Sequence, residues 1–169
     1  TFAFAALRYF NASGCAMDGS LGEDHDPETH LIPVVLQAAL GVRPKVTVYG
    51  TDYPTPDGTC VRDYIHVDDL ADAHILAMQK LVQGQSMHLN LGTGRGFSVK
   101  EIIATAEKVT GRKVPVEYGP RRPGDAVALW ADASAAKATL GWQPQHTDPE
   151  TIIRSAWNWF SRYPRGYEK

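Results

Sequence analysis

The stretch at residues 58–74, GTCVRDYIHVDDLADAH, decides the fold, because a strand pattern in it passes directly into a helix pattern. Apolar and polar side chains alternate over 61–67, which indicates a buried strand, and the acidic residues that follow open a helix over 69–82. A strand that runs straight into a helix is the repeating unit of α/β folds.

The rest of the chain continues this alternation. Further strands are expected at 2–10, 45–49, 87–91 and 114–118, and further helices at 29–40, 98–110, 132–140 and from 148 to 160. We therefore predict an α/β fold with a largely parallel sheet. Such sheets bind ligands beyond the carboxyl ends of their strands, which points to the loops at 11–30, 50–60 and 92–97.

Composition excludes several classes of protein. The chain has 169 residues, 43% hydrophobic and 21% charged, as expected for one globular domain. A net charge of −2 predicts no nucleic-acid partner, and no apolar run is long enough for a membrane span. Cys15 and Cys60 form no CxxC motif, so we expect free thiols and a cytoplasmic protein. The chain starts without methionine inside an apolar run, and we expect an upstream part to be missing.

Charged residues interrupt the strand at 61–67. Side chains alternate along a strand, so Arg62 and Tyr64 point one way and Asp63 points the other. A guanidinium beside a phenol suits a phosphate, whereas the alternative is an Arg–Asp ion pair on an edge strand. Asp63 lies among apolar residues, so we expect it to be buried and hydrogen-bonded in a structural role.

A second pair of arginines lies in the segment PRRPGD at 120–125. Arg122 could join Arg62 in holding a diphosphate, or Arg121 and Arg122 could form a solvated loop. Asp125 could accept hydrogen bonds from sugar hydroxyls, or it could close the Pro-Gly turn. The local pattern leaves both alternatives open.

Two further motifs favour ordinary structural roles. The segment GTGRG at 92–96 lacks the third glycine of the dinucleotide motif G-x-G-x-x-G, which would fall on Phe97, so we interpret it as a strand-to-helix turn. Asp68 and Asp69 are explained by helix capping and by the helix dipole, and with Asp72 they do not require a metal. We expect no metal site.

Six motifs, in this order and at these spacings, closely resemble the C-terminal half of the UDP-glucose 4-epimerase family of extended short-chain dehydrogenases/reductases. They are RYFNASG (8–14), ETHLIP (28–33), VYGTDYPTPDGTCVRDYIHVDDLADAH (48–74), NLGTGRGFSV (90–99), PRRPGD (120–125) and WFSRYPRGY (159–167). The resemblance covers essentially the whole chain. Its most specific part is 52–67, where related nucleotide-sugar dehydratases and decarboxylases usually have a shorter loop and a phenylalanine in place of Tyr64.

The resemblance implies a Rossmann domain that carries a smaller substrate domain. Residues 1–12 would be a late strand of the NAD-binding sheet, 13–60 and 110–169 would form the UDP-sugar domain, and 61–109 would return to the Rossmann sheet. The N-terminal NAD-binding half would be missing. The implied activity is the interconversion of UDP-galactose and UDP-glucose in galactose metabolism, by transient NAD-dependent oxidation at sugar C4.

The resemblance also implies a role for each matching residue. Arg62, Arg122 and Asn11 would bind the diphosphate with Tyr64 alongside, Asp125 a ribose hydroxyl, and Leu129 would border the C2 substituent of the sugar unless it simply packs in the core. The implied substrate-binding residues are Asn11, His30, Leu31, Thr47, Val48, Tyr49, Arg62, Tyr64, Arg122, Asp125 and Leu129. The implied NAD-binding residues are Tyr9 and Phe10, at the nicotinamide end.

The catalytic residues of the family have no counterpart in this sequence. Its Tyr-x-x-x-Lys pair is absent, because none of the seven tyrosines has a lysine four positions later. The resemblance therefore implies a UDP-sugar-binding chain that is inactive alone and belongs to a homodimer when complete. The alternatives are a non-catalytic UDP-sugar-binding module, or an epimerase that acts on UDP-N-acetylglucosamine.

Overall fold

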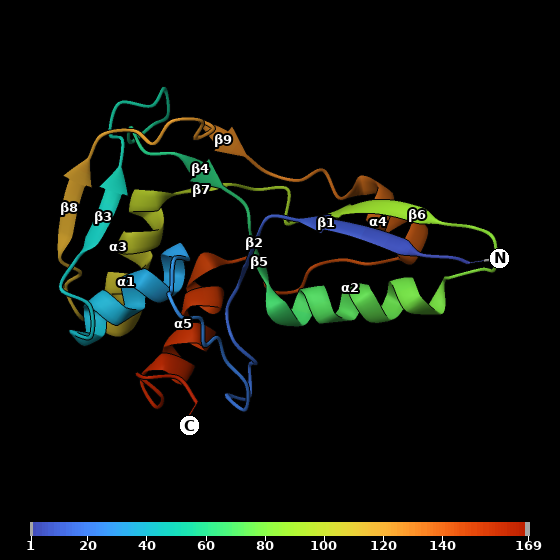
Figure 1. The fold of residues 1–169 in the computed structure, drawn as a ribbon, viewed down its shortest axis with the longest axis horizontal. Coiled ribbons are helices and arrows are strands. Elements are labelled where there is room, and N and C mark those ends of the chain that lie inside the picture. Colours follow the sequence, from blue (N-terminus) through green and yellow to red (C-terminus); the bar gives the residue numbers. More distant parts are fainter. Residues whose placement is uncertain (1, 168–169) are drawn as a thin grey trace.

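The computed structural model describes residues 2–167 as an α/β fold (Figure 1). Thr1, Glu168 and Lys169, at the ends of two predicted domain ranges, lie outside the described residues. The strands are β1 (Ala5–Tyr9), β2 (Asn11–Ser13), β3 (Val46–Tyr49), β4 (Val61–Arg62), β5 (Tyr64–His66), β6 (Met87–Leu91), β7 (Phe97–Ser98), β8 (Val116–Gly119) and β9 (Ala128–Leu129). The helices are α1 (Leu31–Leu40), α2 (Val67–Gln79), α3 (Val99–Thr110), α4 (Ser134–Leu140) and α5 (Pro149–Phe160).

The strands form small, mostly parallel sheets, which confirms the predicted fold class. β1 pairs with β6, β2 with β5 and β3 with β8, each in parallel. β4 lies between β7 and β9, antiparallel to the first and parallel to the second. None of the helices within residues 2–167 combines the length and apolarity that crossing a bilayer requires.

Two predicted strands need correction. The strand at 61–67 is two strands, because the chain changes sheets at Asp63: β4 joins β7 and β9, whereas β5 joins β2. The strand at 2–10 is shorter and is not fully buried, since β1 pairs on one side alone within the described residues and Phe2 and Phe4 are exposed.

Helix ends follow the local sequence closely. Ser98 and Glu101 form the predicted capping box of α3, and Asp148 caps α5 with Pro149 in its first turn. Gly111 ends α3 with φ +68°, a left-handed conformation that glycine adopts without strain. α2 differs from the prediction, because its N-cap is His66, whose ring accepts a hydrogen bond from the backbone N–H of Asp68.

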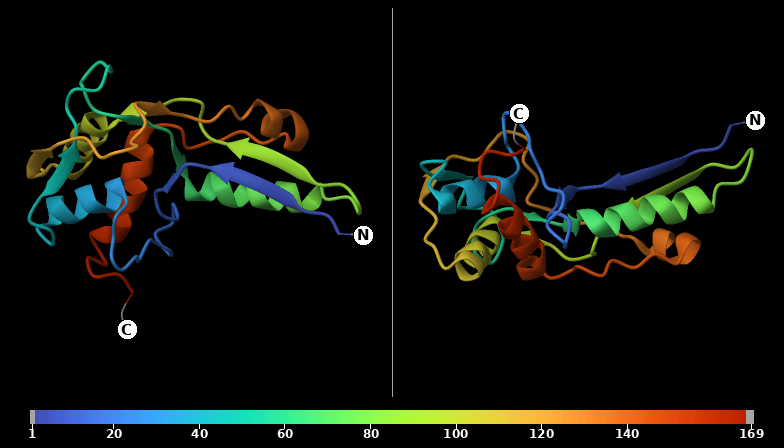
Figure 2. Two further views of the ribbon diagram at one scale, coloured as in Figure 1. Left: turned by 45° about the horizontal axis from the view of Figure 1, so that its top comes forward. Right: turned by 90° about the horizontal axis from the view of Figure 1, so that it is seen from below.

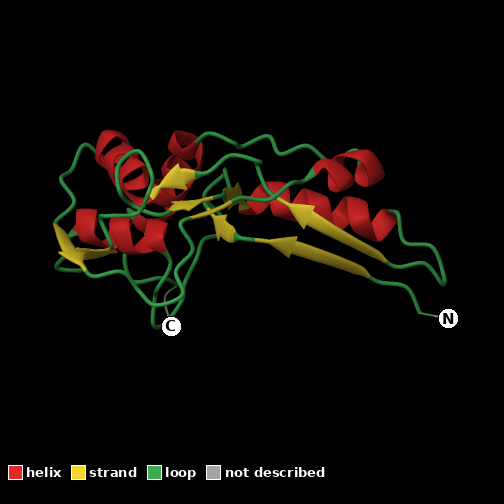
Figure 3. Ribbon diagram, turned by 90° about the horizontal axis from the view of Figure 1, so that it is seen from above, coloured by secondary structure: helices red, strands yellow, loops and turns green. Residues whose placement is uncertain are grey.

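The hydrophobic residues form two clusters. In one, α1, α3 and α5 pack together beside β3 and β8. In the other, α2 and α4 pack on the β1–β6 pair, which extends away from the first group (Figures 2 and 3). Two helices pack across the predicted domain boundaries. α3, from the range 61–109, packs with α1 and α5 in the first cluster, and α4, from the range 110–169, packs with α2 and β6 in the second.

Asp63 ties three distant segments together. It is 1% exposed, and its carboxylate accepts hydrogen bonds from the backbone N–H groups of Thr93, Gly94 and Ala131 and from the Thr93 hydroxyl. A Cβ at Gly92 would lie 2.5 Å from Asp63 Oδ2, so the GTGRG turn needs glycine to close around the carboxylate. The structural role of Asp63 is confirmed, whereas the GTGRG turn connects β6 to the short strand β7, which continues directly into α3.

Candidate functional site

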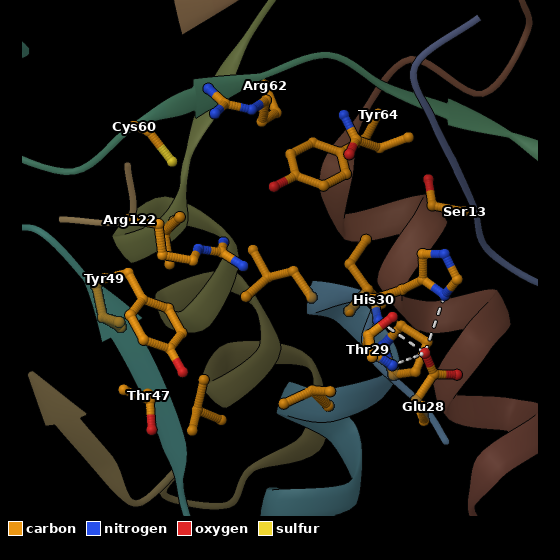
Figure 4. A pocket seen from close by; sticks show the side chains of 18 of the residues that line it. Ser13, Glu28, Thr29, His30, Thr47, Tyr49, Cys60, Arg62, Tyr64 and Arg122 are labelled. Carbon is orange, nitrogen blue, oxygen red and sulfur yellow. Dashed lines mark hydrogen bonds and ion pairs between the residues drawn. The ribbon is translucent and has the colours of Figure 1, made fainter. Parts of the chain in front are cut away.

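A cavity of about 420 Å³ opens between the start of α1, strand β3 and strands β4 and β5 (Figure 4). Ten of the eleven predicted substrate-binding residues line it: Asn11, His30, Leu31, Thr47, Val48, Tyr49, Arg62, Tyr64, Arg122 and Asp125. These residues come from segments far apart in the sequence. The structure therefore brings together nearly the whole predicted set around one space.

Arg62 is held rigidly at the wall of this cavity. Its guanidinium donates to Asp125 Oδ1 at 2.5 Å and to the carbonyl oxygens of Val61 and Ala126 at 2.8 Å each. Its side chain is 15% exposed. The Arg–Asp ion pair considered from the sequence is therefore present, although its strand lies between two neighbours rather than at an edge.

Arg122 and Arg121 point to different places. Arg122 lies over the ring of Tyr49, with 4.6 Å from its guanidinium carbon to the ring centre, and its side chain is 63% exposed. Arg121 instead pairs with Asp52 and stacks on Tyr53, which ties the 50–60 loop to the segment at 120–125. One arginine of the pair therefore serves the loop, and the other faces the cavity.

Only one of the two carboxylate oxygens of Asp125 accepts a hydrogen bond from the described residues. Oδ1 accepts from Arg62, whereas Oδ2 is buried without a hydrogen-bond partner among the described residues and lies 3.7 Å from Arg122 Nε. Two guanidinium groups and one carboxylate leave this part of the cavity with a formal charge of +1. The region therefore suits an anion, with an acceptor beside it for a hydroxyl donor.

Tyr64 and Cys60 add two protonated groups to the cavity. Burial raises the pKa of the Tyr64 phenol well above its usual range, so the phenol remains a hydrogen-bond donor at neutral pH. Burial also raises the pKa of Cys60, whose thiol lies beside the two arginines. Cys60 was absent from the predicted set, although it lies two positions before Arg62 in the same segment.

Asn11 and β3 supply further polar groups at the wall of the cavity. Asn11 Nδ2 donates to the carbonyl oxygen of Asp63 at 2.8 Å, which fixes its amide at the cavity wall. β3 pairs with β8 alone among the described strands, so the backbone groups on its other edge, over Thr47 to Tyr49, stay available. The resemblance implies that Thr47 to Tyr49 bind the substrate, and such a free edge could bind a uracil through its backbone groups.

Glu28 is a wall residue that the sequence did not single out. It is buried at the start of α1 and accepts from the backbone N–H groups of Thr29 and His30. The motif ETHLIP contains it, but the resemblance implies roles in that motif for His30 and Leu31 alone. Other lining residues missing from the prediction are Ala12, Ser13, Thr29, Ile32, Pro33, Val34, Arg43, Lys45, Val46 and Val99.

Three predicted residues lie outside the cavity lining. Tyr9 and Phe10 are exposed at the junction of β1 and β2. Leu129, on β9, pairs in register with Arg62 of β4 and is 39% exposed, so it does not pack in the core formed by residues 2–167. The prediction that it borders the sugar stays a prediction.

Comparisons with known proteins agree with the motifs. The family model described as GDP-mannose 4,6 dehydratase matches residues 2–155. A UDP-glucose 4-epimerase of Streptococcus mutans is 55% identical over 98% of this chain and 50% of its own length. A solved UDP-glucose 4-epimerase is 51% identical with a TM-score of 0.94, over 99% of this chain and 51% of that one.

A second solved structure carries ligands. It is a UDP-glucose 4-epimerase from Bifidobacterium longum in complex with NAD+ and UDP, 43% identical with a TM-score of 0.93 over 98% of this chain and 50% of that one. The chain spans about half the length of the curated relatives it matches. Its predicted resemblance to UDP-glucose 4-epimerases is confirmed, and the chain belongs to the family that the GDP-mannose 4,6 dehydratase model describes.

Proposed function

We propose that this chain is the substrate-binding part of a UDP-glucose 4-epimerase, an isomerase that interconverts UDP-galactose and UDP-glucose. The observation that carries the proposal is the convergence of Arg62, Arg122 and Tyr64 on one cavity, around a net positive charge. Similarity to UDP-glucose 4-epimerases over nearly the whole chain supports the choice of substrate.

The side chains suggest how a UDP-sugar would be oriented. Arg122, whose guanidinium is not fully committed to the protein, would bind the diphosphate, while the Tyr64 phenol donates to a phosphate oxygen. Asp125 Oδ2 is free to accept from a ribose hydroxyl. Asn11 would contact the phosphates, His30 and Leu31 would lie beside the UDP, and the free edge of β3 would face the uracil.

NAD is the cofactor that we propose for the complete protein, since the Bifidobacterium longum relative was solved with NAD+ and UDP. The residues of this chain fit one end of it: Tyr9 and Phe10 offer an exposed aromatic surface at the junction of β1 and β2. The sequence contains no G-x-G-x-x-G motif to hold the pyrophosphate. When bound, NAD supplies a hydride acceptor for the oxidation at sugar C4.

We further propose that the complete protein is a cytoplasmic homodimer of galactose metabolism. Both cysteines are buried and free, as expected in a reducing compartment. The dimer and the pathway rest on the resemblance alone.

UDP should bind to the purified 169-residue chain, but the chain should not turn over UDP-galactose, because it has no Tyr-x-x-x-Lys pair. Calorimetric titration with UDP and a coupled epimerase assay measure the two properties. Turnover of UDP-galactose by the chain alone would contradict the proposal that the catalytic residues lie in another part of the complete protein. If a version joined to an upstream NAD-binding half binds UDP without turnover, the binding-module alternative holds instead.

Replacing Leu129 with tyrosine in the complete protein should narrow the space beside the C2 substituent of the sugar. We expect UDP-glucose and UDP-galactose to be preferred already, with some turnover of the N-acetylhexosamine pair. Leu129→Tyr should lower kcat/KM for UDP-N-acetylglucosamine by about 10- to 200-fold, with little change for UDP-glucose. Leu129→Met conserves size and serves as the control. Equal loss on both substrates, or none on either, would remove Leu129 from the pocket.

A further inference from the structure

Four potential metal ligands converge in the loop before α1, in the pattern Glu-x-His-x-x-Glu-x-His. They are Glu23, His25, Glu28 and His30, here called the Glu/His cluster, and one ligand atom from each lies within 4.8 Å of all the others. His25 Nδ1 is 2.8 Å and His30 Nδ1 is 3.0 Å from the same oxygen, Glu23 Oε1. Both imidazoles therefore present Nδ1 to the carboxylates.

Glu28 gives this cluster a buried carboxylate with a free oxygen. Its side chain is 4% exposed, and its Oε1 accepts from the backbone N–H groups of Thr29 and His30 and lies 2.9 Å from His30 Nδ1 (Figure 4). Its Oε2 makes no hydrogen bond to the described residues and lies 3.7 Å from His25 Nδ1. The backbone thus fixes a buried carboxylate whose second oxygen points into the cluster.

The two carboxylates of the cluster favour a cation between them. Glu23 and Glu28 place carboxylate oxygens within 4.8 Å of each other, and the Glu28 side chain is only 4% exposed. Arg43 lies beside the cluster, but it donates to the backbone carbonyl of Glu28 and to Gln37 rather than to either carboxylate. A divalent ion would balance both carboxylates while leaving the two imidazoles neutral.

We propose that the Glu/His cluster binds a Zn²⁺ ion. Two imidazole nitrogens with two carboxylate oxygens suit Zn²⁺, whereas Mg²⁺ and Ca²⁺ prefer sites made of oxygen alone. Tetrahedral zinc with bonds of about 2.0–2.2 Å keeps its ligand atoms roughly 3.3–3.6 Å apart. Three of the nitrogen–oxygen separations in the cluster, 2.8, 2.9 and 3.0 Å, are hydrogen-bond distances, and the fourth is 3.7 Å, so Zn²⁺ would replace the shared protons and the three close pairs would move apart.

The ion would have a structural effect on the substrate cavity. Glu28 and His30 line that cavity, and Glu23 and His25 belong to the long loop that leads to α1. Zinc would fasten the loop to the start of the helix and so hold one wall of the cavity in place. The site shares Glu28 and His30 with the wall of the substrate cavity, although the proposed UDP-sugar function itself requires no metal.

A second group of potential metal ligands differs from the Glu/His cluster in its hydrogen bonds. His66, Asp68 and His146 also lie close together. Both ring nitrogens of His66 are already used, since Nδ1 accepts from the backbone N–H of Asp68 and Nε2 bonds to the hydroxyl of Ser155. That group is therefore not available to a metal.

Metal titrations of the tag-free, EDTA-treated protein test the site. Calorimetry with ZnSO4 at pH 7.5 should show one ion per chain, and Co²⁺ should give the intense visible bands of tetrahedral nitrogen–oxygen coordination. His25→Gln should weaken Zn²⁺ binding by about 100-fold or more, because loss of a direct ligand exceeds the 10- to 100-fold effect of a supporting residue. His25 is 54% exposed, so the variant should keep its fold, which circular dichroism checks.

His88→Gln is the matched control, since it removes an exposed imidazole from β6 and should leave Zn²⁺ affinity unchanged. The proposal fails if no stoichiometric binding is found, if Co²⁺ is bound octahedrally, or if the two variants weaken binding equally. A thiolate-to-cobalt charge-transfer band would assign the metal to Cys15 or Cys60 and would also overturn it.

Discussion

Replacing Asp63 with alanine is expected to lower the free energy of unfolding by about 3–5 kcal/mol, the range for removing one partner of a buried charged network. The carboxylate accepts from three backbone N–H groups and one hydroxyl, in a place that is closed to water. Its loss leaves these donors unpaired, at about 1–3 kcal/mol each before water enters the space. The 92–96 turn and the segment at Ala131 would lose their link to the strand.

Urea unfolding of the purified protein measures this change. Asp63→Asn keeps the shape and one acceptor oxygen, so it should cost less than alanine. Asp72→Ala removes an exposed carboxylate from α2 and should stay within about 0.5 kcal/mol of the parent. A loss below about 1 kcal/mol for Asp63→Ala would show that its hydrogen bonds contribute little net stability.

Asp63 also shows how far sequence reasoning reaches. Alternation along 61–67 predicts its burial, because that period is a local property. Its partners, Thr93, Gly94 and Ala131, lie 30 or more positions away, so only the tertiary fold reveals them. The change of sheet at Asp63 could not be predicted for the same reason. The side-chain period of two continues through Asp63, and only the hydrogen bonds to different neighbouring strands separate β4 from β5.

Local signals explain which other predictions succeeded. Ser98, Asp148 and Gly111 act through nearby backbone groups, so the ends of α3 and α5 could be located from sequence. The N-cap of α2 was misplaced because a histidine, which is not a usual capping residue, takes that position.

The candidate site also contains residues that the sequence could identify and residues that it could not. Family motifs identified ten of the residues that line the cavity. The motif PRRPGD could not separate the two arginines, because loop side chains have no fixed period. The Glu/His cluster was missed although its spacing is visible in the sequence. The loop that holds it has neither helical nor strand periodicity, so nothing local indicates that four ligands meet.

Arg122→Ala in the complete protein should weaken UDP-sugar binding by about 2–4 kcal/mol, roughly 30- to 1,000-fold, by removing a charge-assisted hydrogen bond from a phosphate that binding desolvates. Arg122 is the sharper test of the cavity than Arg62. Arg62 also holds Asp125 and two backbone carbonyls, so its removal, although expected to cost a similar amount of binding, would disturb the protein itself.

The neighbouring Arg121 provides the control for this prediction. Arg121→Ala removes the same charge one position away, but that guanidinium is bound to Asp52 and stacked on Tyr53. A general electrostatic attraction would therefore be weakened equally by both variants, whereas a directed phosphate contact would be lost in Arg122→Ala alone. Calorimetry with UDP and the KM for UDP-galactose distinguish the two cases. NAD content should be unchanged in both variants, because neither arginine lies at the junction of β1 and β2, where Tyr9 and Phe10 are exposed.

An unchanged KM in Arg122→Ala would remove this residue from the phosphate site and would leave Arg62 and Tyr64 to bind the diphosphate without it.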